Sequence, residues 1–255
     1  MPTPSRVSLF VTCLVDLLYP QVGEATVALL EDAGIAVDFP ASQTCCGQPA
    51  YNSGFPDDAR RVALTLLDAF EGADAVVSPS GSCAGMVRTQ YRHLFHGTRH
   101  EDRARALAAN TYELTEFLVD VAGYDMGASK WDGEVTYHDS CHGLRELGLR
   151  GQGRQLLGHV EGLTLTEMAW PDRCCGFGGT FSLRLPDVAT AMADDKVHQA
   201  EATGATVMVT GDSGCLMHLA GRASRLGSAI RPMHVATLLA EARGLVPSTA
   251  AAGPA

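Results

Sequence analysis

The stretch Cys174-Cys175-Gly176-Phe177-Gly178-Gly179 has an earlier counterpart in Cys45-Cys46-Gly47. The spacing around the two pairs is similar, with 31 and 32 residues before the pair and 36 and 39 after it. One spacing pattern that occurs twice and leaves no cysteine over indicates a duplicated site. Each cysteine pair has one single cysteine before it and one after it, so all eight cysteines form two quartets: Cys13, Cys45, Cys46 and Cys83, then Cys141, Cys174, Cys175 and Cys215.

The composition is that of an ordinary globular chain. Its 255 residues, 46% of them hydrophobic, suffice for one large domain or two of about 125 residues. The net charge of −10 argues against nucleic acid and anionic membranes as partners, since both recruit basic patches. The apolar run at residues 7–15 is too short to span a membrane, and no signal-cleavage pattern follows it. We therefore expect a cytoplasmic protein whose cysteines are not paired in disulfides.

The hydrophobic pattern predicts strands that alternate with helices. Strands are expected at residues 7–12, 35–39, 73–78, 134–138, 163–168 and 206–210. Helices are expected at residues 21–32, 56–72, 101–121, 154–159, 186–204 and 234–243, two of them opened by proline. The small and polar segment 123–133 is the candidate boundary. The prediction is therefore one domain at residues 1–125, a second at 126–246, and a disordered tail at 247–255.

This order of elements predicts an α/β fold of two duplicated halves, each a small parallel sheet flanked by helices. Every cysteine follows a predicted strand or lies in the loop after one. Because ligands bind at the carboxyl ends of parallel strands, the three cysteine-bearing loops of each half should meet at one edge of its sheet. The register of the repeat supports duplication, since Gly72 and Gly204 each lie eleven residues before the last cysteine of their quartet.

The quartets are typical of a thiolate-bound metal. Zinc usually takes four ligands from two Cys-x-x-Cys knuckles, and two adjacent cysteines suit a single zinc ion poorly. A [4Fe–4S] cluster offers several irons, so adjacent thiolates can reach different ones, and four thiolates are its usual ligand set. The glycines Gly47, Gly176, Gly178 and Gly179 permit close backbone approach, with N–H groups available to sulfur. Zinc, and plain packing of small apolar thiols, remain the alternatives.

The repeated Cys-x31-Cys-Cys-Gly-x35-Cys pattern resembles the cysteine-rich "CCG" domain family over residues 7–243. That family includes the catalytic subunit of heterodisulfide reductase and the iron–sulfur subunits of glycolate oxidase and anaerobic glycerol-3-phosphate dehydrogenase. The nearest resemblance is to its small two-domain members, which act in lactate utilisation with two partner proteins, one of them a further iron–sulfur protein. The resemblance implies one or two [4Fe–4S] clusters, bound by all eight cysteines, in a complex that oxidises L-lactate to pyruvate.

The sequence departs from the heterodisulfide reductase pattern at two positions. The subunit of that enzyme carries a fifth cysteine three residues after the last one of each quartet and holds a noncubane cluster. Met86 and His218 occupy these positions here, so the resemblance does not transfer the noncubane chemistry. His218 is a candidate iron ligand or a hydrogen-bonded helix residue, and Met86 is expected to pack.

Four further residues have two interpretations each. His138 and His142 flank Cys141 and either tune a cluster or are surface groups at a strand end. Arg145 and Arg184 either clamp a substrate carboxylate or are solvated charges. No glycine-rich dinucleotide motif follows a predicted strand.

Three functions remain open from the sequence. The first is an electron-transfer subunit, the second is an enzyme that reduces a substrate at a cluster iron, and the third is a metal-stabilised scaffold. Redox titration distinguishes the scaffold from the other two, because the metal of a scaffold accepts no electrons.

Overall fold

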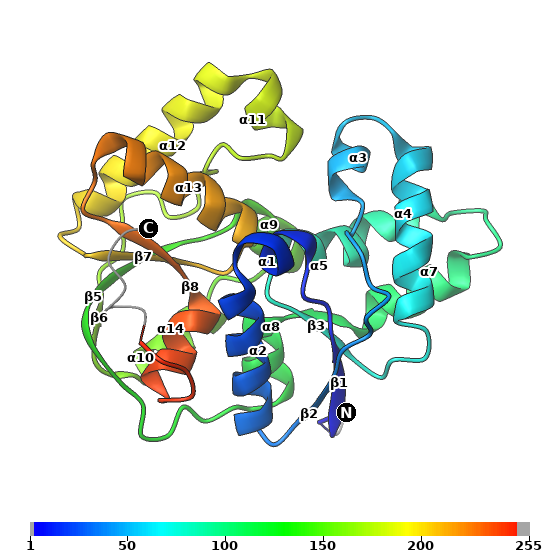
Figure 1. Ribbon diagram of the computed structural model, residues 1–255, viewed down its shortest axis with the longest axis horizontal. Helices are drawn as coiled ribbons and strands as arrows, with labels where there is room; N and C mark the ends of the chain where they lie inside the picture. The colour runs from blue at the N-terminus through cyan, green and yellow to red at the C-terminus, as the bar shows by residue number, and fades with distance from the viewer. Residues whose placement is uncertain (1–2, 249–255) are drawn as a thin grey trace.

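A computed structural model describes residues 3–248, and the chain folds into two four-stranded parallel sheets (Figure 1). The first sheet has the order β2–β1–β3–β4, and the second has the matching order β6–β5–β7–β8. This confirms the predicted α/β fold with two duplicated halves. The strands are β1 (Arg6–Leu9), β2 (Ala36–Asp38), β3 (Val76–Ser78), β4 (Thr111–Glu113), β5 (Lys130–His138), β6 (Glu161–Leu165), β7 (Val207–Thr210) and β8 (Arg231–His234).

Helices connect the strands in both halves. The first half contains α1 (Cys13–Leu18), α2 (Pro20–Asp32), α3 (Gln48–Asn52), α4 (Pro56–Ala69), α5 (Gly81–Gly85), α6 (Tyr91–Leu94), α7 (Glu101–Asn110) and α8 (Leu114–Glu116), with wider turns η1 (Met86–Gln90) and η2 (Phe117–Val121). The second half contains α9 (Cys141–Leu147), α10 (Gln152–Gly158), α11 (Thr180–Arg184), α12 (Pro186–Glu201), α13 (Ser213–Leu226) and α14 (Val235–Ala242).

The fourth strand of each sheet was missing from the sequence prediction. The helix predicted at residues 101–121 is wrong, because the chain leaves α7 at Asn110 and continues as β4. Glu113 then starts a new helix as one half of a capping box with Glu116. In the second half, β8 contains Pro232, which lacks an N–H and therefore suits an edge strand.

The two halves share one apolar core. A continuous cluster of buried side chains runs from Val7 and Val77 in the first sheet to Val135 and Val209 in the second. Helix α14 at the end of the second half packs beside α2 of the first half (Figure 1). The ends of these helices are joined by an ion pair of 2.8 Å between Arg243 and Asp32. The domain division at residue 125 stays a prediction, and most of the predicted tail, residues 249–255, lies outside the described residues.

Each sheet has a second apolar cluster on its other face. In the first half this cluster includes Phe10, Leu66 and Phe70, and in the second half Met208, Ala200 and Leu219. Within β3, Val76 packs into the outer cluster and Val77 into the shared core. Both faces of the sheet are therefore covered, which is the usual environment of a parallel sheet.

Four cysteines predicted to lie in loops or turns lie instead in the first turns of helices. Cys13 and Cys141 are the first residues of α1 and α9, and Cys83 and Cys215 lie near the starts of α5 and α13. Only the two cysteine pairs lie in loops. The helices still follow β1, β3, β5 and β7 closely, so the cysteines lie at the carboxyl edges of the sheets. Within residues 3–248, no helix is long and apolar enough to cross a membrane.

A buried carboxyl group makes the stability of this fold depend on pH. Glu113 is 2% exposed, and burial raises its pKa to about 7, although Thr115 and Glu116 donate hydrogen bonds to it. Its second oxygen, Oε1, has no hydrogen-bond partner. Since the unperturbed pKa is 4.5, the folded state keeps a proton between pH 4.5 and 7 that the unfolded state has lost. Stability therefore falls as pH rises through this range.

We expect Glu113→Gln to remove this dependence. The variant should gain up to about 3 kcal/mol over the native chain at pH 8, and the two should be nearly equal at pH 4.5. Urea unfolding at pH 5, 6, 7 and 8 measures the difference. The control is Glu161→Gln, which changes an exposed glutamate. Identical pH profiles for Glu113→Gln and the native chain would show that Glu113 is ionised in the folded state throughout.

Candidate metal centre

The first quartet is brought together from three segments. Cys13 lies at the start of α1, Cys45 and Cys46 lie in the loop before α3, and Cys83 lies in α5. The sulfurs of Cys13 and Cys45 are 3.7 Å apart, and those of Cys46 and Cys83 are 3.6 Å apart. The two neighbouring cysteines thus face different partners, as ligands of different metal atoms would.

The second quartet repeats this arrangement. The sulfurs of Cys175 and Cys215 are 3.3 Å apart, and Cys174 interacts with Cys141. All eight cysteines lie within the described residues, and all are free thiols. The sulfur–sulfur contacts are far longer than the roughly 2.05 Å of a disulfide bond. The structure therefore brings together the four cysteines predicted for each site.

The thiols within each quartet influence one another strongly. The pKa of Cys45 falls to about 3, chiefly because Cys13 donates a hydrogen bond to its sulfur. The pKa of Cys174 falls to about 2 for the same reason, with Cys141 as the donor. The pKa of Cys46 rises well above its ordinary value because of its contact with Cys45. Crowded sulfurs of this kind cannot all ionise unless a cation lies between them, which is the situation of thiolate metal ligands.

The glycine after each cysteine pair has two structural roles. The N–H groups of Gly47 and Gly176 point at the sulfurs of Cys45 and Cys174, each at 3.4 Å. Both glycines have left-handed backbones, with φ of +83° and +90°. A Cβ on Gly176 would lie 2.6 Å from the carbonyl oxygen of Ala189, so the loop lies directly against α12. The sequence Cys-Cys-Gly is therefore needed for the shape of the loop as well as for its thiols.

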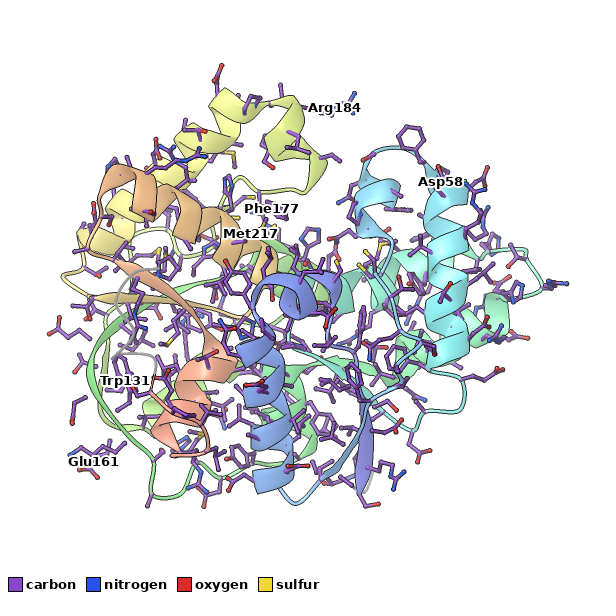
Figure 2. All side chains as sticks on the ribbon, in the orientation of Figure 1. Asp58, Trp131, Glu161, Phe177, Arg184 and Met217 are labelled. Carbon is purple, nitrogen blue, oxygen red and sulfur yellow. The ribbon has the colours of Figure 1, made fainter. Side chains whose placement is uncertain are left out.

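A cavity of about 120 Å³ lies at the first quartet, and all four of its cysteines line it. Its opposite wall comes from the second half and includes Phe177, Ser213 and Gly214. Figure 2 shows Phe177 between α11 and α13. Phe177 follows the second cysteine pair in the chain by two residues, so one loop carries ligands of the second quartet and covers the first.

A buried aspartate joins the two quartets. Asp212 is 3% exposed, and its Oδ1 accepts hydrogen bonds from the N–H groups of Gly214 and Cys215 at the start of α13. Its Oδ2 accepts a hydrogen bond of 2.8 Å from the N–H of Ser82, next to Cys83. One carboxylate therefore fixes the helices that carry the last cysteine of each quartet. Asp212 was not predicted from the sequence, although an aspartate directly before a helix is a common N-cap.

A buried histidine provides a second link between the halves. Nε2 of His234 donates to the carbonyl oxygen of Pro79 at 3.0 Å, while Nδ1 accepts from the N–H of Ala236. Burial lowers the pKa of His234 to about 4, so the ring is neutral at physiological pH. This histidine was not predicted either, since nothing near it in the sequence indicates a partner 155 residues away.

His138 is not the surface group that its position at a strand end favoured. The side chain is fully buried, and a ring nitrogen lies with the sulfurs of Cys175 and Cys215 in a group whose atoms are all within 4.8 Å of one another. Among the described residues, neither ring nitrogen makes a hydrogen bond of normal geometry. Burial lowers the pKa of His138 to about 3, and the nearby carbonyl of Pro171 opposes this only weakly.

The other candidate residues lie further from the sulfurs or serve other contacts. Nε2 of His218 is 3.4 Å from the carbonyl oxygen of Ala189, and its ring packs beside Phe177. Ligation by His218 therefore stays a prediction without a sulfur contact in its support. Met86 is fully buried in the apolar cluster of the first half. Nδ1 of His142 is 3.6 Å from the sulfur of Cys141.

The two arginines proposed as a carboxylate clamp do not share a cavity. Arg145 lines an open cavity of about 450 Å³ together with Arg173 and Cys174. Arg184 is absent from that lining and is exposed at the end of α11 (Figure 2). Nothing in their arrangement supports a joint role.

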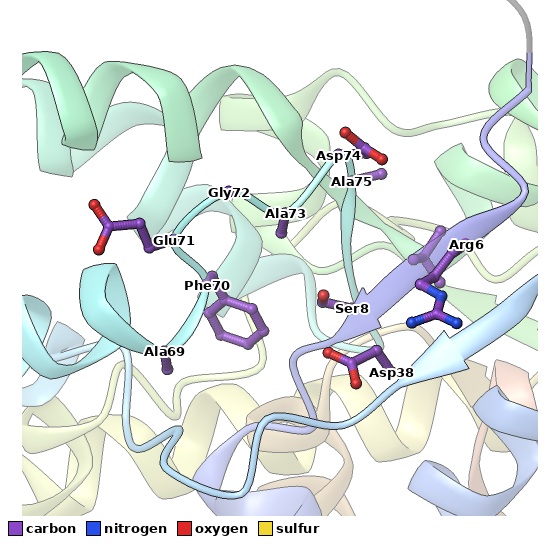
Figure 3. Close-up of a pocket in the computed structure, with 11 residues that line it drawn as sticks. Arg6, Ser8, Asp38, Ala69, Phe70, Glu71, Gly72, Ala73, Asp74 and Ala75 are labelled. Carbon is purple, nitrogen blue, oxygen red and sulfur yellow. The ribbon is translucent and has the colours of Figure 1, made fainter.

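Another cavity lies at the opposite edge of the first sheet (Figure 3). It measures about 210 Å³, and its lining includes Arg6, Asp38 and Asp74. No cysteine lines it, and it lies at the amino ends of β1 and β3. Since ligands of parallel sheets bind at the carboxyl ends of the strands, the cysteine edge is the better functional site.

The donor sets fit iron–sulfur clusters. Each quartet supplies four thiols, directed backbone N–H groups and, at the first site, a cavity framed by the cysteines. The coordination number and the sulfur ligands match those of cubane clusters. Zinc remains chemically possible at four thiolates, but the adjacent cysteines with separate partners favour a group of several metal atoms.

Comparison with known proteins agrees with this description. The model of the cysteine-rich domain family CCG matches residues 7–88 and 135–220. Lactate utilization protein A of Geobacillus kaustophilus is 51% identical over 92% of this chain and 98% of its own length. The protein of the same name from Bacillus subtilis is 47% identical, with the same coverage of both chains.

A solved structure supports the fold alone. A hypothetical protein from Helicobacter pylori superposes with a TM-score of 0.62 at 10% identity, over 97% of this chain and 50% of the other. The two matched domains each contain one quartet, and the relatives span nearly the whole chain. The chain therefore belongs to the cysteine-rich CCG domain family, which here includes the proteins called lactate utilization protein A.

Proposed function

We propose that the chain is the electron-transfer subunit of a complex that oxidises L-lactate to pyruvate, with a [4Fe–4S] cluster in each cysteine quartet. The observation that carries the proposal is the gathering of eight free thiols into two groups at neighbouring sheet edges. Clusters bound by such thiolates accept and release single electrons. The names of relatives at about 50% identity support lactate as the substrate.

The reaction requires an acceptor for two electrons, since oxidation of lactate to pyruvate releases two electrons and two protons. Two one-electron sites in one chain match this number. Within the chain, Asp212 holds the Cys83 and Cys215 segments together, and Phe177 lies between the quartets. The chain's own residues would thus keep the two redox sites close and shield them from water.

The partners in this proposal are two further proteins of a lactate-utilisation complex in the cytoplasm, one of which carries iron–sulfur clusters of its own. Glycolate and glycerol 3-phosphate are the alternative substrates of the same kind of subunit. A catalytic role like that of heterodisulfide reductase predicts activity of the isolated chain, and a scaffold role predicts a metal that cannot be reduced.

Growth on L-lactate as the sole carbon source tests the substrate. Deletion of the gene, in a strain without any other lactate dehydrogenase, should abolish growth on L-lactate and leave growth on glucose unchanged. The native gene should restore growth, and a gene with Cys175→Ser should not. Undiminished growth of the deletion strain on L-lactate would exclude lactate and direct attention to glycolate and glycerol 3-phosphate.

A further inference from the structure

The two quartets differ in the side chains behind their sulfurs. In the first half, Cys46 and Cys83 belong to one apolar cluster with Phe10, Leu66 and Phe70. The rings of Phe10 and Phe70 meet edge to face with centroids 5.7 Å apart. All the groups named behind the first quartet are therefore hydrocarbon.

The duplicated register identifies the equivalent residues of the second half. His138 lies three residues before Cys141, as Phe10 lies three residues before Cys13. In α12, Lys196 lies ten residues after the opening proline, in the position that Leu66 has in α4. Ala200 likewise replaces Phe70. His138 and Lys196 are both fully buried, so two polar side chains occupy the place of two apolar ones.

These polar groups face the sulfurs of the second quartet. A nitrogen of His138 is grouped with the sulfurs of Cys175 and Cys215, without a hydrogen-bond partner of its own. An unpartnered polar group at such depth is costly, typically about 1–3 kcal/mol, so a partner is expected in the loaded protein. Lys196 donates to the carbonyl oxygen of Trp170, and the charge of Cys175 acts on it.

We propose that His138 donates an N–H hydrogen bond to a sulfur of the second site and makes it the site of higher reduction potential. The proposal rests on the cluster occupancy of the proposed function. Four thiolates already satisfy the four irons of a cubane cluster, which leaves the imidazole as a donor to sulfur. A reduced cluster carries one more negative charge, and N–H donors at its sulfurs stabilise that charge. The first site has Phe10 at this position and lacks the donor.

The consequence is a preferred place for the first electron. In a chain that has received one electron, the second site is reduced by one and the first site remains oxidised. A second electron then reduces the first site. The two quartets thus form an ordered pair in spite of their common origin.

Redox titration of His138→Phe, followed by electron paramagnetic resonance, tests the proposal. The variant copies the residue of the first half, and the potential of its second site should fall by at least about 59 mV, a tenfold change for one electron. His138→Gln keeps an N–H donor and should recover part of the loss. The potential of the first site should stay constant in both variants and is the internal control.

Pulsed resonance on protein labelled with ¹⁵N-histidine gives a second readout. The reduced native chain should show a weak nitrogen coupling that disappears in His138→Phe. A strong coupling typical of nitrogen bonded to iron, loss of iron from His138→Phe alone, or equal potentials in all three proteins would each overturn the proposal. A native chain without iron and sulfide would contradict the proposed function instead, so the two failures are distinguishable.

Discussion

Replacement of Cys175 by serine is expected to remove about half of the iron and acid-labile sulfide of the chain. The sulfur of Cys175 lies 3.3 Å from that of Cys215, and serine offers a much poorer ligand for iron than thiolate. Because the ligands of one quartet come from separate segments, loss of the metal should also destabilise the second half. Metal analysis and thermal unfolding of the anaerobically purified variant measure both effects.

The matched variant is Cys46→Ser, which changes the equivalent residue of the first quartet. It should also lose about half of the iron, and the double variant should lose nearly all of it. Each single variant should retain the resonance signal of the other site. Full iron content and native melting in both single variants would mean that these cysteines are not ligands.

Gly176→Ala should have the largest effect on stability of any single-methyl change at the sites. Its φ of +90° disfavours an L-residue, and the new Cβ would lie 2.6 Å from the backbone oxygen of Ala189. Backbone strain of this kind costs about 1–3 kcal/mol before the clash is added. Since the loop cannot move without displacing Cys174 and Cys175, we expect a loss of about 3 kcal/mol or more and a depleted second site.

Two further glycines separate the causes of this loss. Gly204→Ala has the same kind of left-handed backbone, with φ of +81°, and no close neighbour, so it measures strain alone. Gly47→Ala places its Cβ 3.0 Å from the oxygen of Ala59 and should be intermediate. Urea unfolding should therefore rank Gly176→Ala as the most destabilised and Gly204→Ala as the least. Equal losses in the three variants would show that contact with α12 is unimportant.

The sequence predicted the duplicated α/β fold and the grouping of the cysteines because both follow from local patterns. Alternation of apolar runs with helical periodicity predicts parallel sheets, and the repeated spacing of Cys45-Cys46-Gly47 and Cys174-Cys175-Gly176 indicates the repeat. The comparisons confirm the family and the two cysteine-rich domains.

Features that depend on tertiary contact were beyond the sequence. Strand β4 follows a good helical pattern without a Gly or Pro to end it, and only pairing with β3 decides its conformation. The burial of His138 arises from α12 and α13 packing over the end of β5, which the local sequence does not encode. The link between Asp212 and Ser82 crosses 130 residues and joins two halves whose relative placement the pattern leaves open.

Iron and acid-labile sulfide per chain, measured on anaerobically purified protein from iron-sufficient cells, test most directly whether both quartets hold iron–sulfur clusters. We expect brown protein with about eight iron and about eight sulfide per chain, four of each for every quartet. Stoichiometric zinc without sulfide would contradict the assignment of clusters to these quartets.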